Sequence, residues 1–556
     1  MNRLWTTQRE MALSKTVAVI ALLLTLTLTS EPARTQDKPA PVAQVAGLPA
    51  EIPISPIEQA EKDGTSIHIS LRDLTKLALQ NNLSIAISDT NEEYYQKRVL
   101  QAYGPYDPAI SVRLGIQSVL SPNTNKVNQA QGNANSAITD LWNFSISQNI
   151  PTGGGFQFAV NSSRYDTNQL FSLFNPQYNS SATLSFTQPL WRNRSIDANR
   201  GAIKIYNLDV KISDSQFKQS VVNTIASTQG AYWDLVFQIR YYDIVKQSVK
   251  LAQTQVHDNR EKVRIGVLAP IEITVAQSGM ASRMVDLLNS RKGIIQAENN
   301  LKATISTDRN ADIWHQVIVP TDSVDFVEYK MDLDQAIDTA LAKRPELEQY
   351  DLQIQENDIN YRVTNSQKKW GVDFQGTFGY AGVAGPNSAI PELAGGVGTA
   401  YSTLFTQGFR SWSTGLQIYI PLKNRTYESL LAQLQIQKKG YLLNRKNQEQ
   451  TIAVQIRNAF QDLETNKQNI DTSRIARELA EAQLDGEQKR FQAGMSENFL
   501  VLQRQTELAT ALGQELLALV AYKKSVISLQ QYMYTLLEAQ DFELAGSGKP
   551  IVKEFK

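Results

Sequence analysis

The chain runs through the same series of features twice, and this internal repeat limits its fold more than any other property. Residues 71–83 read LRDLTKLALQNNL and residues 333–347 read LDQAIDTALAKRPEL. Each copy is followed by alternating strands that end in Pro-Leu, and then by a very long helical stretch with a glycine break. A tandem repeat of this kind predicts an architecture of two equivalent units, whose function follows from its shape rather than from an active site.

The N-terminus has the composition of a secretory signal. Basic residues precede an apolar run over residues 17–28, which is short for a membrane-spanning helix. We therefore expect a signal peptide over residues 1–33, with a retained anchor helix as the alternative. Residues 34–66 are rich in Pro, Ala and Glu without periodicity and are expected to form a flexible leader. Residues 541–556 are expected to form a C-terminal tail.

The composition argues against several classes of function. The 55 basic and 55 acidic residues balance, so nothing favours a nucleic-acid partner. The sequence has no cysteine, which excludes disulfides and thiolate metal sites. His68, His257 and His315 are far apart without metal-ligand spacing, and Gly153–Gly155 lacks the Lys-Ser/Thr of a phosphate-binding loop. We therefore predict no enzyme activity, no cofactor and no metal site.

Several segments alternate strictly between apolar and polar residues. Ile110, Val112 and Leu114 would share one face of a strand, opposite Ser111 and Arg113. A period of two indicates a strand with one face in an apolar environment and one in water. The other alternating segments are 142–147, 156–161, 182–187, 372–378 and 412–420.

The connections between these strands favour a membrane β-barrel over a soluble β-sandwich, which alternates in the same way. Residues 151–155 (PTGGG) form a tight turn, whereas 120–138, 166–179 and 381–410 are long. Short turns on one side and long loops on the other are typical of outer-membrane barrels.

The hairpin 140–165 is predicted to add two strands to the sheet of the first repeat. Six strands cannot close a barrel, so the chain is expected to oligomerise.

Two stretches of about 70 residues are predicted to be long helices. Neither Trp191 to Gly266 nor Lys423 to Gly494 contains a further proline or a loop-like cluster. The helix that follows the first break has apolar residues at a spacing of seven, which predicts coiled-coil packing. An ordinary soluble bundle is the alternative. The heptad positions are Met280, Leu287, Ile294 and Leu301.

With its repeat, strands, Pro-Leu junctions and glycine breaks, the chain resembles the TolC-type outer-membrane factor (outer membrane efflux protein) family over about residues 67–540. The resemblance implies an α+β membrane protein that forms a homotrimer. Its transmembrane antiparallel β-barrel would lie in outer-membrane lipid and continue as a long α-helical coiled-coil tunnel in the periplasm. It would act as a passive exit duct for tripartite efflux or type I secretion, with a periplasmic adaptor and an inner-membrane transporter as partners.

A structural coiled-coil protein of the cell envelope, with a β-sandwich head, is the alternative to an exit duct.

Under the family interpretation each protomer has two tandem structural repeats. Repeat 1 is expected over 67–320, with an initial helix, strands at about 107–190 and a helical hairpin at 195–306. Repeat 2 is expected over 321–540, with an initial helix, strands at about 371–420 and a hairpin at 423–536.

The resemblance also implies sites at the two helical tips. In the family, a Val-Gly-Leu-Thr-like motif at the tips meets the adaptor, and glycine suits a tip because it tolerates backbone angles that reverse the chain. The alternative is that each glycine only ends its helix and that the tip contacts no partner. The matching residues are Ile265, Gly266, Val267, Leu268 and Ala269 at the first break and, more weakly, Ala493, Gly494, Met495 and Ser496 at the second.

Family members narrow the tunnel near the tips, often with rings of aspartate. The acidic match here is Glu272, six residues beyond the first tip glycine. Leu500 and Gln503 stand at the corresponding places of the second repeat, so an acidic ring is expected from the first repeat alone. A solvated helix carboxylate is the alternative role for Glu272. The basic residues near the tips that are available to pair with it are Lys262, Arg264 and Arg490.

Overall fold

The structure is a computed structural model that describes residues 52–123, 134–386, 390–539, 542–544 and 550–552. The signal peptide predicted over residues 1–33 lies outside the described residues. The fold below is that of the unit that begins at Ile52.

The described part of the expected leader is folded. Helix α1 (Pro56–Asp63) begins with a capping box, in which the Ser55 hydroxyl accepts from the Glu58 N–H at 3.0 Å and the Glu58 carboxylate accepts from the Ser55 N–H. Strand β1 (Ser66–Ile69) follows and pairs in parallel with β6 (Val317–Pro320). The prediction of a flexible leader is therefore wrong for these residues, because their capping signal and distant strand partner outweigh a composition typical of loops.

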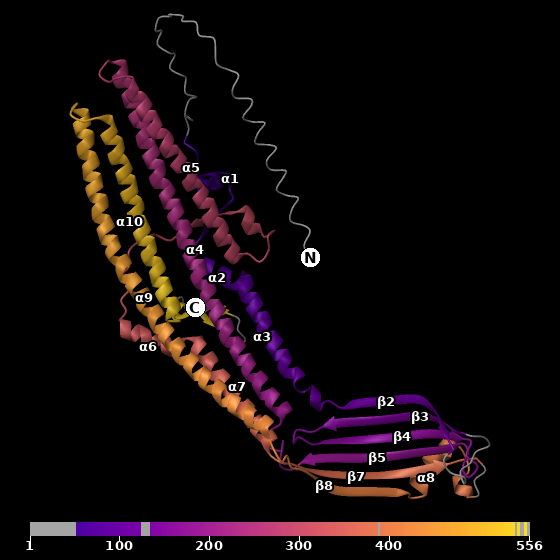
Figure 1. Cartoon of the computed structure of the whole chain (residues 1–556). Coiled ribbons are helices and arrows are strands. Elements are labelled where there is room, and N and C mark those ends of the chain that lie inside the picture. The colour runs from indigo at the N-terminus through magenta and orange to yellow at the C-terminus, as the bar shows by residue number, and fades with distance from the viewer. Residues whose placement is uncertain (1–51, 124–133, 387–389, 540–541, 545–549, 553–556) are drawn as a thin grey trace, which may run out of the picture. The chain divides into compact units, whose positions relative to one another are not determined.

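A six-stranded antiparallel sheet follows in the order β2-β3-β4-β5-β7-β8 (Figure 1). Four of its strands come from the first half of the chain and two from the second. The predicted hairpin 140–165 is confirmed as part of this sheet, because β3 and β4 pair along their lengths and meet at the turn after Asn149. The strands are β2 (Ala109–Pro122), β3 (Ala134–Asn149), β4 (Gly155–Thr167), β5 (Gln177–Pro189), β7 (Gly371–Ala384) and β8 (Arg410–Tyr419).

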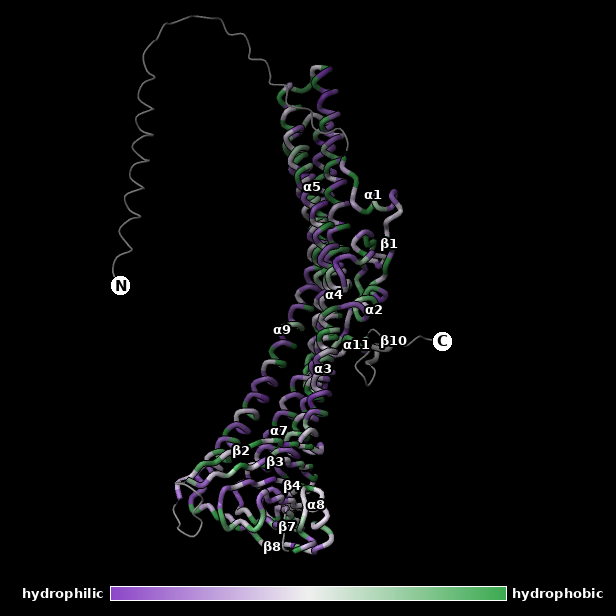
Figure 2. Tube along the Cα trace, turned by 90° about the vertical axis from the view of Figure 1, so that its right-hand side faces the viewer, coloured by the Kyte–Doolittle hydropathy of each residue, from purple (hydrophilic) through white to green (hydrophobic). Residues whose placement is uncertain are grey.

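The register gives this sheet one apolar and one polar face. Because side chains alternate between faces along a strand, residues paired across neighbouring strands share a face. Hydrophobic and hydrophilic residues accordingly alternate along the strands without long blocks of either kind (Figure 2). One apolar row is Val112, Phe144, Val160, Ala182 and Tyr380. The adjacent residues form a row on the opposite face that is polar except for Ala381, namely Arg113, Asn143, Asn161, Ser181 and Ala381.

Helices of matching length lead into and out of the sheet in both halves of the chain. Each entry segment, which we predicted as a single helix, consists of two helices. Asn82 separates the first pair, and its side chain caps the second helix of that pair; Arg344 precedes Pro345 in the second pair. The entry helices are α2 (Leu71–Asn81), α3 (Leu83–Gln101), α6 (Leu333–Lys343) and α7 (Pro345–Lys368).

Two long helical hairpins carry the chain away from the sheet, and the shorter second helix of each returns only part of the way (Figure 1). The first consists of α4 (Ala198–Arg264) and α5 (Ile271–Ile305), and the second of α9 (Arg425–Gln492) and α10 (Asn498–Tyr532). Helix α10 also packs against α4, so the two hairpins adjoin. None of the helices in the described part is long and apolar enough to cross a bilayer.

The predicted heptad of α5 faces the core of the first hairpin. Leu287, Ile294 and Leu301 are almost wholly buried, and Met280 is buried as well. Burial of each such side chain contributes about 1.5–3 kcal/mol. The heptad pattern therefore marks the packed face of this helix, as expected.

The C-terminal segment is short and paired. Helix α11 (Leu536–Ala539) is followed by β9 (Phe542–Leu544) and β10 (Pro550–Val552), which pair in antiparallel fashion. The expected tail over 541–556 therefore contains two short strands.

One carboxyl in the helical part predicts a pH effect on stability. Burial, together with the hydrogen bond and the charge of Asp209, raises the pKa of Glu356 from 4.5 to about 7. Arg98 pairs with Asp209 at 3.5 Å rather than with Glu356. Between pH 4.5 and about 7 the folded chain keeps a proton that the unfolded chain has released. The stabilisation from this proton is complete below pH 4.5 and is lost as the pH rises through about 7.

We therefore expect Glu356→Gln to raise the free energy of unfolding at pH 8 by about 1–3 kcal/mol and to flatten its decline between pH 5 and 8. Melting temperatures of the purified protein across this range measure both effects. Glu348→Gln, which changes an exposed carboxylate on the same helix, is the control. An unchanged pH profile in Glu356→Gln would contradict the role given to this carboxyl.

Candidate functional site

The two glycine breaks are the tips of the two helical hairpins, and their backbones are built alike. Gly266 has φ +78° and Gly494 has φ +74°, in the left-handed region. At the first tip the Gly266 N–H donates to the Val263 carbonyl at 3.0 Å and the Val267 N–H to the Lys262 carbonyl at 2.9 Å. This paired arrangement is a Schellman motif, which satisfies the last carbonyls of a helix and requires a left-handed residue.

The second tip repeats this motif. The Gly494 N–H donates to the Phe491 carbonyl at 3.2 Å, and the Met495 N–H donates to the Arg490 carbonyl at 2.9 Å. An added β-carbon would meet no atom within 4 Å at either glycine. Both glycines are therefore required for their backbone angle and not for close packing.

The tips expose apolar side chains. The exposed fractions are 62% for Ile265, 70% for Val267 and 74% for Met495, and Phe499 just beyond the second tip is 63% exposed. The predicted tip residue Leu268 is half-buried, and Ser496 hydrogen-bonds to Glu487. Exposed apolar residues that form a contiguous patch are typical of surfaces that contact another molecule.

Side chains join the tips of the two hairpins within one chain. The Lys262 ammonium lies 3.8 Å from the centroid of the Phe491 ring, a cation–π contact between the ends of α4 and α9. Glu272, in the first turn of α5, accepts a hydrogen bond of 3.1 Å from the side-chain amide of Asn498, the first residue of α10. The carboxylate predicted for a constriction therefore links the two hairpins.

A buried amide network supports this link. Gln255 donates to Asn498 at 2.9 Å and to Asn259 at 3.0 Å, and Asn259 donates to the Glu272 carbonyl at 3.3 Å. Asn498 is 2% exposed and Asn259 is fully buried. A buried amide that loses its partner costs about 1–3 kcal/mol, so this network holds α4, α5 and α10 in one arrangement. We name these residues, Gln255, Asn259, Glu272 and Asn498, the tip network.

A buried arginine makes a second connection farther from the tips. Arg283 on α5 donates to Gln505 at 2.8 Å, to the Leu502 carbonyl at 2.8 Å and to Thr506 at 3.1 Å, all on α10. Burial lowers the pKa of Arg283, and the nearby charge of Asp286 partly opposes this shift.

We did not predict the roles of Gln255, Asn259, Asn498 and Arg283. The sequence signal was a polar residue within an apolar helical stripe.

The structure assigns other partners to the basic residues that we had considered for Glu272. Arg264 pairs with Glu261 at 2.9 Å and Arg490 with Glu487 at 3.8 Å, while Lys262 contacts the Phe491 ring. The suggested ion pairs are therefore wrong in this structure, because each arginine has a carboxylate three residues before it on its own helix.

Leu500 and Gln503 do not join Glu272. Leu500 is exposed on α10, and Gln503 donates to Glu507 at 3.0 Å. The second repeat therefore contributes Asn498 to the region around Glu272, and not the two residues expected from the correspondence between the repeats.

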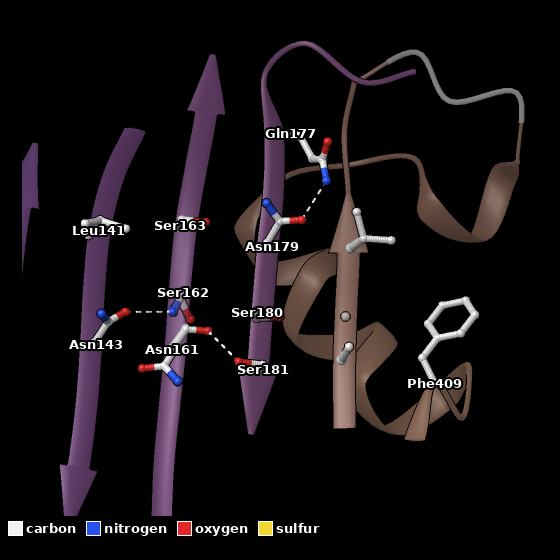
Figure 3. A pocket seen from close by; sticks show the side chains of 13 residues that line it. Leu141, Asn143, Asn161, Ser162, Ser163, Gln177, Asn179, Ser180, Ser181 and Phe409 are labelled. Carbon is white, nitrogen blue, oxygen red and sulfur yellow. Dashed lines mark hydrogen bonds between the residues drawn. The ribbon is translucent and has the colours of Figure 1, made fainter. Parts of the chain in front are cut away.

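The polar face of the sheet carries a shallow hollow of about 610 Å³ (Figure 3). Its lining is mostly Asn, Gln and Ser side chains, such as Asn143, Asn161 and Asn179, together with Phe409. The Asn143 side chain accepts from the Ser162 N–H at 3.2 Å, and Gln177 donates to Asn179 at 2.7 Å. Such a lining offers water or a polar solute uncharged hydrogen-bonding groups. No cluster of three or more potential metal ligands occurs among the residues that the structure describes.

Comparisons with known proteins point to one family. The family model described as outer membrane efflux protein matches residues 74–307 and 336–533, which is well over half of the chain. No curated protein matches the chain by sequence.

Solved structures share the fold at low sequence identity. The CmeC outer membrane channel of Campylobacter jejuni is 15% identical, with a TM-score of 0.61, over 92% of this chain and 94% of that one. A membrane protein from Pseudomonas aeruginosa is 12% identical, with a TM-score of 0.61, over 89% and 99%. The outer membrane protein VceC of Vibrio cholerae is 15% identical, with a TM-score of 0.57, over 84% and 95%. Because the family model covers both helical hairpins and the six-stranded sheet, the chain belongs to the outer membrane efflux protein family.

Proposed function

We propose that the protein is the outer-membrane exit duct of a tripartite efflux pump and that it works as a homotrimer. The observation that carries this proposal is the two-faced sheet with two open edges, continuous with long helical hairpins. The family is one of outer-membrane channels and not of enzymes. The family is described as one of efflux proteins, which favours an efflux pump over a type I secretion system as the assembly that uses this duct.

The exposed apolar face of the sheet supports a membrane barrel. Leu114 and Ile116 on β2 are 75% and 79% exposed, and Trp412 on β8 is 72% exposed. In water this surface would be unfavourable by about 25 cal/mol per Å² of apolar area. In a bilayer it matches the lipid-facing band of a barrel, while the polar face lines the lumen.

The sheet edges require partners. Strands β2 and β8 each pair with one neighbour in the sheet, and unpaired backbone groups are costly in lipid. In the proposed trimer β8 of one protomer pairs with β2 of the next. Three six-stranded sheets then form a barrel of 18 strands, and barrel diameter grows roughly linearly with strand number.

The hairpins form the periplasmic tunnel in this proposal. The exposed apolar residues of the two tips are the surface for a periplasmic adaptor, which connects the duct to an inner-membrane transporter. Glu272 lies close to the tips, where three protomers would converge. Three carboxylates around a narrow axis create a negative potential that favours cations.

An envelope coiled-coil protein with a β-sandwich head is the alternative, and the same sheet argues against it. A sandwich buries its apolar face against a second sheet. In the described part of the chain, the other two sheets have only two strands each, and the apolar residues of β2 are exposed.

The oligomeric state and location test the proposal. We expect the protein to remain in outer membranes washed with carbonate, and to migrate on SDS gels as a trimer when unheated and as a monomer after boiling. The trimer is expected because paired strand edges satisfy backbone hydrogen bonds that a lone sheet would leave open. A water-soluble monomer after removal of the signal sequence would overturn the proposed function.

A further inference from the structure

The connection between β7 and β8 folds into a helix on the apolar face of the sheet, although we expected an irregular loop there. Helix α8 (Val397–Thr406) packs against β7 and β5. The Ser180 hydroxyl donates to the Ala400 carbonyl at 2.7 Å, and the Tyr401 hydroxyl lies 2.8 Å from the Ser162 hydroxyl and accepts from the Trp142 indole at 3.1 Å. The register places Trp142, Ser162 and Ser180 in one row of the apolar face. In Figure 3 the helix accordingly runs behind strands that show their polar side to the viewer.

The sheet is shaped to receive this helix. The row beneath α8 continues from Ser162 and Ser180 to Gly382 on β7. A β-carbon at Gly382 would come within 2.1 Å of the Ala400 carbonyl oxygen. Large residues occupy the preceding row of the same face, such as Val160 and Tyr380. The apolar band therefore stops at α8, and the helix takes the place of the next row of side chains.

The surface that α8 adds is uncharged and carries an aromatic ring. No charged residue occurs between Glu392 and Arg410. Ala400, Thr403 and Leu404 face the sheet and are buried, whereas Phe405 is 76% exposed. The Phe405 ring lies 6.3 Å from the Tyr380 ring, which lies 5.3 Å from that of Phe378. Aromatic rings thus continue from the apolar face of the strand onto the helix.

The position of α8 corresponds to the outer boundary of a bilayer. From Val372 to Tyr380, β7 spans about 27 Å at ~3.4 Å per residue, or about 21 Å of height at a tilt of ~40°. The apolar band of a barrel is about 25 Å tall. Helix α8 lies one row farther from the long helices, near the top of such a band. Aromatic side chains are favoured at this level because they combine apolar area with tolerance of a polar boundary.

We propose that α8 is an interfacial helix that holds the outer rim of the barrel in the outer leaflet, with Phe405 at the boundary between acyl chains and headgroups. The inference rests on the proposed function. A second copy of the chain is a poorer occupant, because α8 lies over the middle strands β3, β4, β5 and β7, whereas neighbouring protomers would meet at β2 and β8. The Thr406 hydroxyl donates to the Ser402 carbonyl at 3.0 Å within the helix, which suits a side chain next to lipid.

The absence of cysteine from the sequence allows a direct test by single-cysteine labelling. Phe405→Cys, Leu416→Cys and Gln417→Cys would each be labelled with a fluorophore in the purified trimer and reconstituted in phosphatidylcholine vesicles. Leu416 and Gln417 are neighbours on β8 that point to the apolar and polar faces. They serve as the lipid-facing and water-facing references. Quenching would be measured with nitroxide lipids labelled at acyl position 5 or 12, and with iodide in the water.

We expect lipid nitroxides to quench the labels at residues 405 and 416 at least twofold more than the label at 417, and position 5 to quench the label at 405 more than position 12. Quenching of the 405 label by iodide alone, with the 416 label still quenched by lipid, would overturn the interfacial role of α8 and leave the proposed function standing. If lipid quenches neither label, the sheet is not in the membrane and the proposed function fails as well.

Discussion

Replacing Gly266 and Gly494 together by aspartate is expected to reduce export to the level of cells that lack the protein, with the amount of membrane-inserted trimer unchanged. Both glycines have left-handed backbone angles and open space around the position of a β-carbon. The new carboxylates would therefore point outwards, next to the exposed apolar Ile265, Val267 and Met495. Placing a charge in an apolar contact without a partner costs several kcal/mol, and the trimer would present six such charges. Accumulation of a fluorescent efflux substrate in cells measures the effect, and unheated gels measure the trimer.

Two control variants distinguish the effect of the added charge on export from the effect of replacing glycine in the backbone. Gly266→Asn with Gly494→Asn adds a side chain of similar size that tolerates left-handed angles and carries no charge, so we expect export to fall much less. Gly486→Asp places the same charge within α9, eight residues before the tip glycine and also with no atom near its β-carbon position, and should leave export unchanged. Export at the normal level in the double aspartate variant would show that the tips are not the docking surface.

The sequence predicted those features that repeat along an element or require one residue type. Alternation indicated the strands of the six-stranded sheet and its two faces, because a period of two persists over many residues. Gly266 and Gly494 were located as the helix breaks, and both adopt the left-handed angles that glycine allows. The spacing of Leu287, Ile294 and Leu301 identified the buried face of α5.

Features that depend on contacts between distant residues were missed. Helix α8 lies in a connection rich in Gly, and its packing depends on Gly382 of β7 and Ser180 of β5. Asn259 and Asn498 interrupt apolar helical stripes, but the sequence does not show which buried amide or carbonyl group of another helix each of them contacts. The ion pairs of Arg264 and Arg490 could have been predicted from the sequence, because Glu261 and Glu487 precede them by three residues on the same helices.

The tip network predicts that conductance and ion selectivity can be separated by mutation. Glu272 supplies a negative charge near the tips, and its bond to Asn498 also ties α5 to α10. We expect Glu272→Ala to raise the leak conductance of the trimer in a planar bilayer and to lower its cation selectivity. Glu272→Gln keeps a hydrogen-bonding side chain without the charge, so it should lower selectivity and leave conductance close to normal.

Asn498→Ala is the complementary change. It retains the carboxylate but removes the amide that contacts both Gln255 and Glu272. Buried groups left without a partner cost about 1–3 kcal/mol each, which favours an arrangement in which α10 separates from α4 and α5. This variant should therefore raise conductance severalfold and keep cation selectivity. If conductance and selectivity stay at their normal values in all three variants, Glu272 is a solvated helix residue and the narrowest part of the tunnel lies elsewhere. If Glu272→Gln and Asn498→Ala behave alike, charge and hairpin contact are not separable functions of this network.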